Sequence, residues 1–105
     1  MHRDFEFWLE NTYKIAGGKQ MDRRSRQSRI SNVRNVEEYE GNLDEHYRRD
    51  KMASLLRRFE YSRDEEARHV APRHRVPFEA GADKYNGTAT LKSAINLYRK
   101  FCDAR

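Results

Sequence analysis

The chain has 105 residues and a formal net charge of +5, and 37% of its residues are charged against 36% that are hydrophobic. This length allows one domain with one modest core, and six Tyr, five Phe and one Trp argue against full disorder. A single cysteine excludes an internal disulfide, and neither an apolar leader nor a run of about 18 apolar residues is present, so we expect a cytoplasmic protein with no membrane contact.

The first predicted helix runs from about Asp4 to Ile15. Its apolar residues recur at helical spacing and would lie on one face: Phe5, Trp8 and Leu9. Asp4 is expected to cap the start of the helix, and Gly17 and Gly18 are expected to end it. We interpret Trp8 as a core residue, with stacking on a nucleic-acid base as the alternative.

A second, longer helix is predicted from Arg23 to Glu40, with Asp22 as its N-cap and Gly41 just after its last residue. Its apolar residues all lie in the second half: Ile30, Val33, Val36 and Tyr39. The first half, through Arg29, contains four arginines and no apolar residue. This half cannot contribute to a core and is expected to extend beyond it or to lie at its rim.

The positive charge of the chain is concentrated in and just before this helix. From Lys19 to Arg34 there are six cations and one anion, so this segment carries the whole net charge of +5. The acids Glu37, Glu38 and Glu40 lie at the other end, which is the reverse of what the helix dipole favours. An anionic partner at the N-terminal half would explain this arrangement, and a solvated basic face is the alternative.

Two shorter helical segments are expected next. One begins at Leu43 and runs through Tyr47, and the other is capped by Asp50 and ends near Ser62. The apolar residues of the second segment again share one helix face: Met52, Leu55, Leu56 and Phe59.

Residues 62–85 are expected to form one long, mobile loop within the single domain of residues 1–105. They contain two prolines and mixed charges, and their apolar residues follow no clear period. Val76 and Phe78 are the residues expected to attach this loop to the core.

The last predicted helix runs through Asp103 and shows the clearest pattern. Asn86 and Gly87 predict a turn, with Thr88 or Thr90 capping the first helical turn. One face of the helix collects the apolar residues: Leu91, Ala94, Ile95, Tyr98, Phe101 and Cys102.

Together these elements predict an all-α fold, a small bundle of four to five helices with one long loop and no sheet. The predicted core consists of Phe5, Trp8, Leu9, Ile30, Val33, Val36, Tyr39, Leu43, Leu55, Leu56, Phe59, Leu91, Ile95, Tyr98 and Phe101.

Residues typical of catalysis or metal binding form no recognisable pattern. His69 and His74 lie in the loop without cysteines or carboxylates at ligand spacing. A metal-dependent nuclease needs carboxylates held on rigid elements. The acids of this part of the chain are expected in the loop and do not meet that need: Asp64, Glu65, Glu66, Glu79 and Asp83. Cys102 is interpreted as a buried, inert thiol. We therefore expect no catalytic residue, no metal and no cofactor, and the chain is not expected to be an enzyme.

Four stretches of the chain resemble a known module. They are F-x-x-W-L at residues 5–9, SRISNVRNVEEYEGNLDEHYRRD at 28–50, SLLRRFEYS at 54–62 and NGTATLKSAINLYRKF at 86–101. In this order they resemble the helical N-terminal module of bacterial restriction-like and phage-defence proteins. That module is similar to the SAM-like core-binding domain of tyrosine recombinases.

The resemblance implies a SAM-like bundle that contacts duplex DNA through its second and last helices. It carries over no catalytic residue, because the recombinase nucleophile and its arginines belong to a separate domain that this chain lacks. The chain ends at Arg105 without an effector domain, so it is expected to be an excised domain or a stand-alone protein.

The leading functional hypothesis is a non-catalytic module that binds duplex DNA, with the basic second helix on the phosphate backbone. The candidate contact residues are Arg23, Arg24, Arg26, Gln27, Arg29, Arg34, Lys92, Arg99 and Lys100. Gln27 or Arg34 would lie nearer a groove, and base reading stays open because arginine binds guanine edges and phosphates alike. The alternative is a protein-interaction module, an inhibitor or adaptor of a phage or defence system, that docks its basic helix on an acidic protein or in a nucleic-acid groove.

Overall fold

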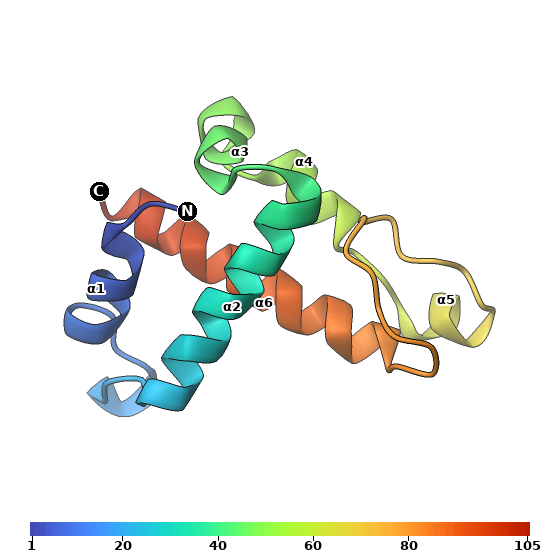
Figure 1. The fold of residues 1–105 in the computed structure, drawn as a ribbon, viewed down its shortest axis with the longest axis horizontal. Helices are drawn as coiled ribbons and strands as arrows, with labels where there is room; N and C mark the ends of the chain where they lie inside the picture. Colours follow the sequence, from blue (N-terminus) through green and yellow to red (C-terminus); the bar gives the residue numbers. More distant parts are fainter.

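Six α-helices build the fold, and the only β-type pairing is an isolated bridge between Lys14 and Gln20 (Figure 1). The computed structural model describes all residues from 1 to 105. The elements are α1 (Asp4–Asn11), a short 3-10 turn η1 (Ala16–Gly18), α2 (Arg23–Glu40), α3 (Leu43–Asp50), α4 (Ala53–Arg58), α5 (Arg63–Ala67) and α6 (Lys84–Asp103). The predicted all-α class is confirmed, with six helices in place of the four to five expected, because the segment 62–85 contains the short helix α5. No helix combines the length and the apolar character that crossing a membrane would require.

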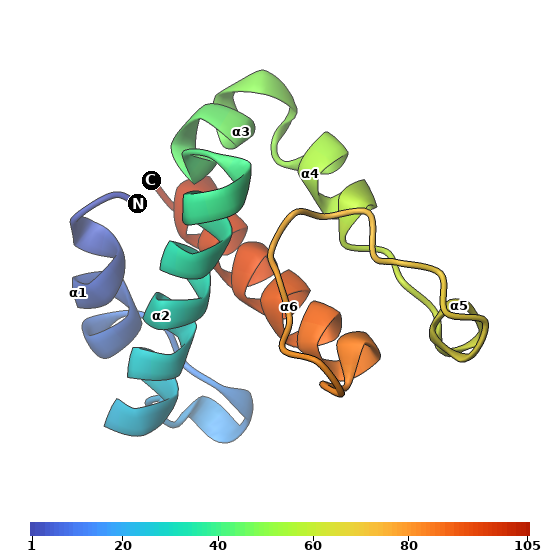
Figure 2. The ribbon, with the colours of Figure 1, turned by 45° about the vertical axis from the view of Figure 1, so that its right-hand side comes forward.

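The centre of the fold is the crossing of α2 and α6, which make the most extensive contact between any two helices (Figures 1 and 2). Helix α6 buries a face of eight residues: Thr88, Leu91, Ala94, Ile95, Leu97, Tyr98, Phe101 and Cys102. Helix α2 contributes Ile30, Val33 and Val36 from its second half. Burial of these side chains is the main favourable term that holds the two helices together.

Helix α1 packs on the C-terminal half of α6 through aromatic side chains. Phe5 contacts Tyr98 with ring centroids 4.9 Å apart and Phe101 at 5.5 Å, and Trp8 contacts Phe101 at 5.6 Å. The Tyr98 hydroxyl accepts a bond from the backbone N–H of His2 (2.6 Å) and donates one to the Asp44 carboxylate (2.7 Å). This buried tyrosine therefore connects α6 to the N-terminal segment and to α3.

Two glutamates at the end of α2 connect it to four other parts of the chain. Glu37 accepts hydrogen bonds from the amino group of Met1 (2.6 Å) and from the backbone N–H of Leu43 (2.9 Å), the first residue of α3. The fully buried carboxylate of Glu40 pairs with Arg58 of α4 and accepts the backbone N–H of Arg75. Two of the three acids at this helix end, Glu37 and Glu40, are thus explained by tertiary contacts, and an anionic partner is not needed to account for them.

Tyr39 is not a core residue as predicted, because 38% of it is exposed. Successive residues of a helix are rotated by about 100°, and the core-facing position near Val36 is taken by Glu40. The apolar pattern of the sequence predicts that Tyr39 is buried and Glu40 exposed. It contains no information on the ion pair with Arg58 that allows Glu40 to be buried.

Several helix ends differ from the prediction. Asp4 is the first residue of α1 and does not cap it, since Arg3 holds the cap position and no side chain bonds there. Helix α1 also ends at Asn11, before the expected Ile15. Helix α3 continues to Asp50, whose carboxylate still accepts the backbone N–H of Ser54 in the first turn of α4 (3.0 Å).

The segment 62–85 is more structured than a single loop. Ser62 and Glu65 form a capping box that starts the short helix α5, and the Glu66 carboxylate accepts the backbone N–H of Tyr85 at 2.9 Å. Val76 is buried and Phe78 packs against the core, as expected for the contacts of this segment. The capping-box sequence Ser-x-x-Glu is present in the chain but lies in a stretch with no apolar period.

The predicted turn at Asn86 and Gly87 is wrong, because both residues lie inside α6. The helix begins at Lys84, and the Asp83 carboxylate caps it by accepting the backbone N–H of Asn86 at 3.0 Å. The glycine has a packing reason: a Cβ at Gly87 would lie 2.7 Å from the Phe78 ring.

Truncation of a fully buried core residue, Leu55 or Ile95, to alanine should lower the free energy of unfolding by about 2–5 kcal/mol. Chemical denaturation measures the loss, with the exposed α2 substitution Ser31→Ala as control. A loss for either core variant no larger than that of the control would contradict the core described above.

The substitution Gly87→Ala should destabilise the protein by about 1 kcal/mol, because the clash with Phe78 outweighs the gain in helix propensity. In a Phe78→Ala background the same change should stabilise by about 1 kcal/mol, because the ring is gone. Denaturation of the four proteins of this cycle gives the coupling energy. Equal effects of Gly87→Ala in both backgrounds would contradict the close contact.

Candidate nucleic-acid interface

The first half of α2 lies at the edge of the molecule, away from α3, α4 and α5 (Figure 1). The helix begins as predicted, because the Asp22 carboxylate accepts the backbone N–H of Ser25 at 2.8 Å. This hydrogen bond is the main cause that lowers the pKa of Asp22. The N-terminus of α2 therefore already has its own anion, and a bound phosphate would have to be contacted mainly by side chains.

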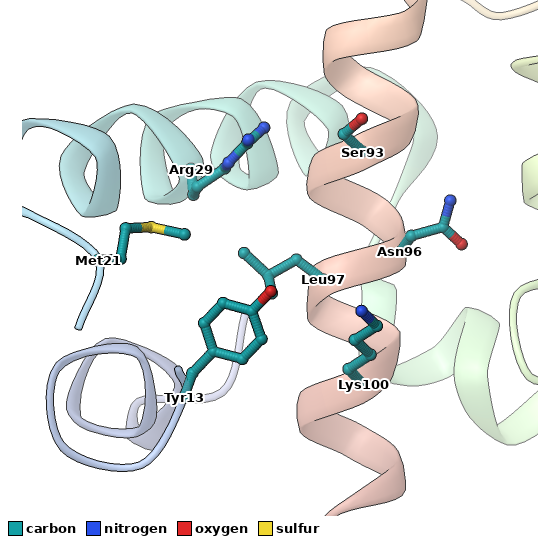
Figure 3. A pocket seen from close by; sticks show the side chains of 7 residues that line it. All are labelled: Tyr13, Met21, Arg29, Ser93, Asn96, Leu97 and Lys100. Carbon is teal, nitrogen blue, oxygen red and sulfur yellow. The ribbon is translucent and has the colours of Figure 1, made fainter. Parts of the chain in front are cut away.

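Two adjoining hollows that share Arg29 lie between α2 and α6, and we call them together the α2–α6 groove. The first hollow, shown in Figure 3, has a volume of about 270 Å³. It is lined by Tyr13, Met21, Arg29, Ser93, Asn96, Leu97 and Lys100. The second is lined by Arg24, Ser25, Ser28, Arg29, Asn32 and Thr90. Apart from Met21 and Leu97, the lining residues of the groove carry positive charges, hydroxyl groups or amides.

Of the nine predicted contact residues, Arg24, Arg29 and Lys100 line this groove. Arg23 is exposed at the first residue of α2. Arg26 is half-buried and donates a hydrogen bond to the carbonyl oxygen of Met21 (2.6 Å), so part of its guanidinium is used within the protein. The groove and the first turn of α2 thus form one basic surface.

The remaining predicted residues lie elsewhere. Gln27 and Arg34 line a different hollow, which also contains Glu6 of α1. Lys92 and Arg99 are seven residues apart and share a line of α6 that is rotated by about 100° from Lys100. The structure does not bring these four residues into the α2–α6 groove.

None of the predicted cations forms an ion pair within the protein. The ion pairs connect other groups, such as Arg58 with Glu40 and Arg73 with Glu65, which are 2.8 Å apart in the second pair. The carboxylates nearest in sequence to the basic half of α2 are also engaged, Asp22 as a helix cap and Glu37 at the start of α3. Asp22 attracts Arg24 in part, whereas Arg29 forms no ion pair with any acid.

Sequence reasoning missed the uncharged lining of the groove. Ser93 and Asn96 stand out in the sequence only as polar positions of the last helix, and Tyr13 lies between α1 and η1, where no period applies. It also missed a second group of exposed cations without ion pairs, on and after α3 and on α4: Arg48, Arg49, Lys51 and Arg57. Asp44, Glu45 and Asp50 lie close to them in the sequence, so the net charge of this stretch is small and no basic run stands out.

The histidines of the segment 62–85 have different surroundings. His74 is buried, stacks on Phe59 with centroids 4.4 Å apart, and forms a 2.9 Å hydrogen bond with the Thr88 hydroxyl. Burial lowers the pKa of His74, an effect that the Glu40 charge partly offsets. His69 is exposed. No group of three or more His, Cys, Asp or Glu residues is arranged to hold a metal ion.

The other candidate groups have structural roles. Burial raises the pKa of the Cys102 thiol to about 11, so the thiol stays protonated and unreactive at neutral pH. The acids near α5 bind backbone N–H groups or arginines: Glu65 caps α5, Glu66 contacts Tyr85 and Asp83 caps α6.

Comparison of the chain with protein-family models, with curated proteins and with solved structures gave no match. The resemblance to restriction-like and phage-defence modules therefore stays a prediction from the sequence.

Acidification should destabilise the protein through His74. Its pKa is lowered in the folded state, so the unfolded chain binds the proton more readily and stability falls as pH drops below about 6.5. One proton limits the slope to about 1.4 kcal/mol per pH unit. His74→Gln should flatten the dependence of the free energy of unfolding on pH between about 6.5 and 5, and the exposed control His69→Gln should keep it. Equal slopes for the wild type and His74→Gln would contradict this assignment.

Proposed function

We propose that the chain is a non-catalytic module that binds duplex DNA, with the α2–α6 groove and the first turn of α2 against the phosphate backbone. The observation that carries this proposal is that Arg24, Arg29 and Lys100 line one polar groove without a carboxylate among its lining residues. Unpaired cations on a shared surface are the usual electrostatic footprint of a nucleic-acid site.

The physical cost of this arrangement supports an anionic partner. Cations in the first turns of a helix are disfavoured by the helix dipole, by about 0.3–1 kcal/mol each when well placed. Asp22 relieves part of this cost at the helix end because its charge also attracts Arg24, and Arg29 lies beyond the first turn, where the dipole effect is small. Binding of phosphates would offset the remainder and release counterions from the DNA.

The predicted resemblance points to the same two helices. In the module that the chain resembles, the second and last helices contact DNA, and here α2 and α6 line the groove. The proposal concerns contacts to the phosphate backbone, which set affinity and orientation but carry no sequence information. Gln27 and Arg34 lie outside the groove, so base reading by these two residues is not part of it.

Replacement of Arg23, Arg24 and Arg29 by glutamine should abolish most of the affinity for a short DNA duplex. The slope of log K against log salt should become shallower by about 0.9 for each phosphate that the variant no longer binds, so by up to about 2.7. Arg26 is left in place because it bonds the carbonyl oxygen of Met21. Binding at three salt concentrations, with the fold checked by circular dichroism, measures both effects.

The charge-matched control is Arg48→Gln, Arg49→Gln and Arg57→Gln, which removes three exposed cations outside the groove. We expect this control to keep most of its affinity and slope. The proposal fails if the wild type does not bind duplex DNA at low salt, or if both triple variants lose affinity equally. Failure of the wild type to bind would favour the alternative, docking on an acidic protein surface.

A further inference from the structure

We propose that the hollow lined by Tyr13, Arg29 and Lys100 is a phosphate-binding pocket that holds one phosphate group of the bound nucleic-acid strand. This inference rests on the proposed function and adds a defined point of contact to it. A diffuse basic surface needs only charge, whereas a pocket also needs uncharged donors at fixed places.

The hollow collects such donors from three parts of the chain (Figure 3). Arg29 comes from α2, Tyr13 from the segment between α1 and η1, and Lys100 from α6. Ser93 and Asn96 precede Lys100 by seven and four residues, so the three lie along one side of α6. The lining residues therefore bring two positive charges, two hydroxyl groups and one amide to one hollow, and in Figure 3 the amide of Asn96 points away from Tyr13 and Arg29.

All of these polar groups are free to bind a ligand. The side chains of Arg29 and Lys100 form no ion pair, and the Tyr13 hydroxyl donates no hydrogen bond within the protein. By contrast, the hydroxyl of Tyr98 donates to Asp44 and that of Tyr47 donates to Asp103 at 2.6 Å. The donors of the hollow thus have unused capacity that phosphate oxygens would satisfy.

The composition of the hollow also selects an anion. Other hollows of the molecule combine their cations with an acid: Glu6 beside Arg34, Asp44 beside Arg48 and Arg105, and Glu66 beside Lys84. No acid lines the hollow at Arg29. Met21 and Leu97, both buried, are the aliphatic residues of its lining.

The test uses substitutions that leave the net charge unchanged. Tyr13→Phe, Ser93→Ala and Asn96→Ala each remove polar atoms from the hollow, and Ser31→Ala on the exposed face of α2 is the matched control. If the pocket holds a phosphate, each pocket variant should lower the affinity for a DNA duplex about tenfold while the salt slope stays as in the wild type. The control should keep the wild-type affinity.

A double substitution, Arg29→Gln with Lys100→Gln, should lower both the affinity and the salt slope. Its charge-matched control is Arg48→Gln with Arg49→Gln. Comparison of 5′-phosphorylated with 5′-hydroxyl duplexes separates two sources of the phosphate. A wild-type preference for the phosphorylated ends that Tyr13→Phe removes would assign a terminal phosphate, and equal binding of the two duplexes with weaker binding by the pocket variants would assign a phosphate within the strand.

The inference and the proposed function can fail separately. If the wild type binds DNA but the uncharged pocket variants bind as tightly as the control, the pocket inference is overturned and the basic surface stands. If the wild type binds no DNA, titration with inorganic phosphate followed by nuclear magnetic resonance decides the pocket. Shifts confined to residues of the hollow, absent in the Arg29 and Lys100 double variant, would support it, and no such shifts would overturn it.

Discussion

The packing of α2 across α6 is the contact on which the rest of the structure depends. Helix α6 presents a buried face along most of its length, and the second half of α2 covers the middle of that face. Other elements pack on the parts of α6 that α2 does not cover. Helix α1 packs its aromatic side chains on the C-terminal half of α6, and α5 joins the N-terminal end of α6 through Glu66 and Tyr85.

Acids at the end of α2 complete this arrangement. Glu37 binds the start of α3, and the buried Glu40 joins α4 and the backbone of Arg75. A buried carboxylate is tolerated only when its oxygens are satisfied, and here a guanidinium and a backbone N–H satisfy them. These contacts use both acids within the fold, at the end of α2 opposite to its basic half.

The same crossing shapes the candidate interface. The second half of α2 is apolar on the side that contacts α6, and the first half is basic. Only the second half of this 18-residue helix therefore belongs to the core. In the basic half, Arg24 and Arg29 share one hollow with Thr90 of α6, and Arg29 also shares the other with Ser93 and Lys100. A ligand in this groove would contact both helices, so its binding would depend on the packing that fixes their relative position.

The sequence by itself determined the all-α class, the start and end of α2, and the buried face of α6. These features depend on local causes, namely the helical period of apolar residues and the caps at Asp22 and Gly41. The sequence also identified the basic half of α2, because a run of arginines without apolar residues can be recognised without knowledge of the fold.

Only the tertiary structure decided which residues lie together across distant parts of the chain. It placed Glu40 in the core in preference to Tyr39, because Arg58 and Arg75 reach that carboxylate. It placed Gly87 inside α6, which begins at Lys84 after the Asp83 cap, and it packed the Phe78 ring where a Cβ of residue 87 would lie. It also gathered Tyr13, Arg29 and Lys100 around one hollow, a juxtaposition that depends on how α2 crosses α6 and that no local period records.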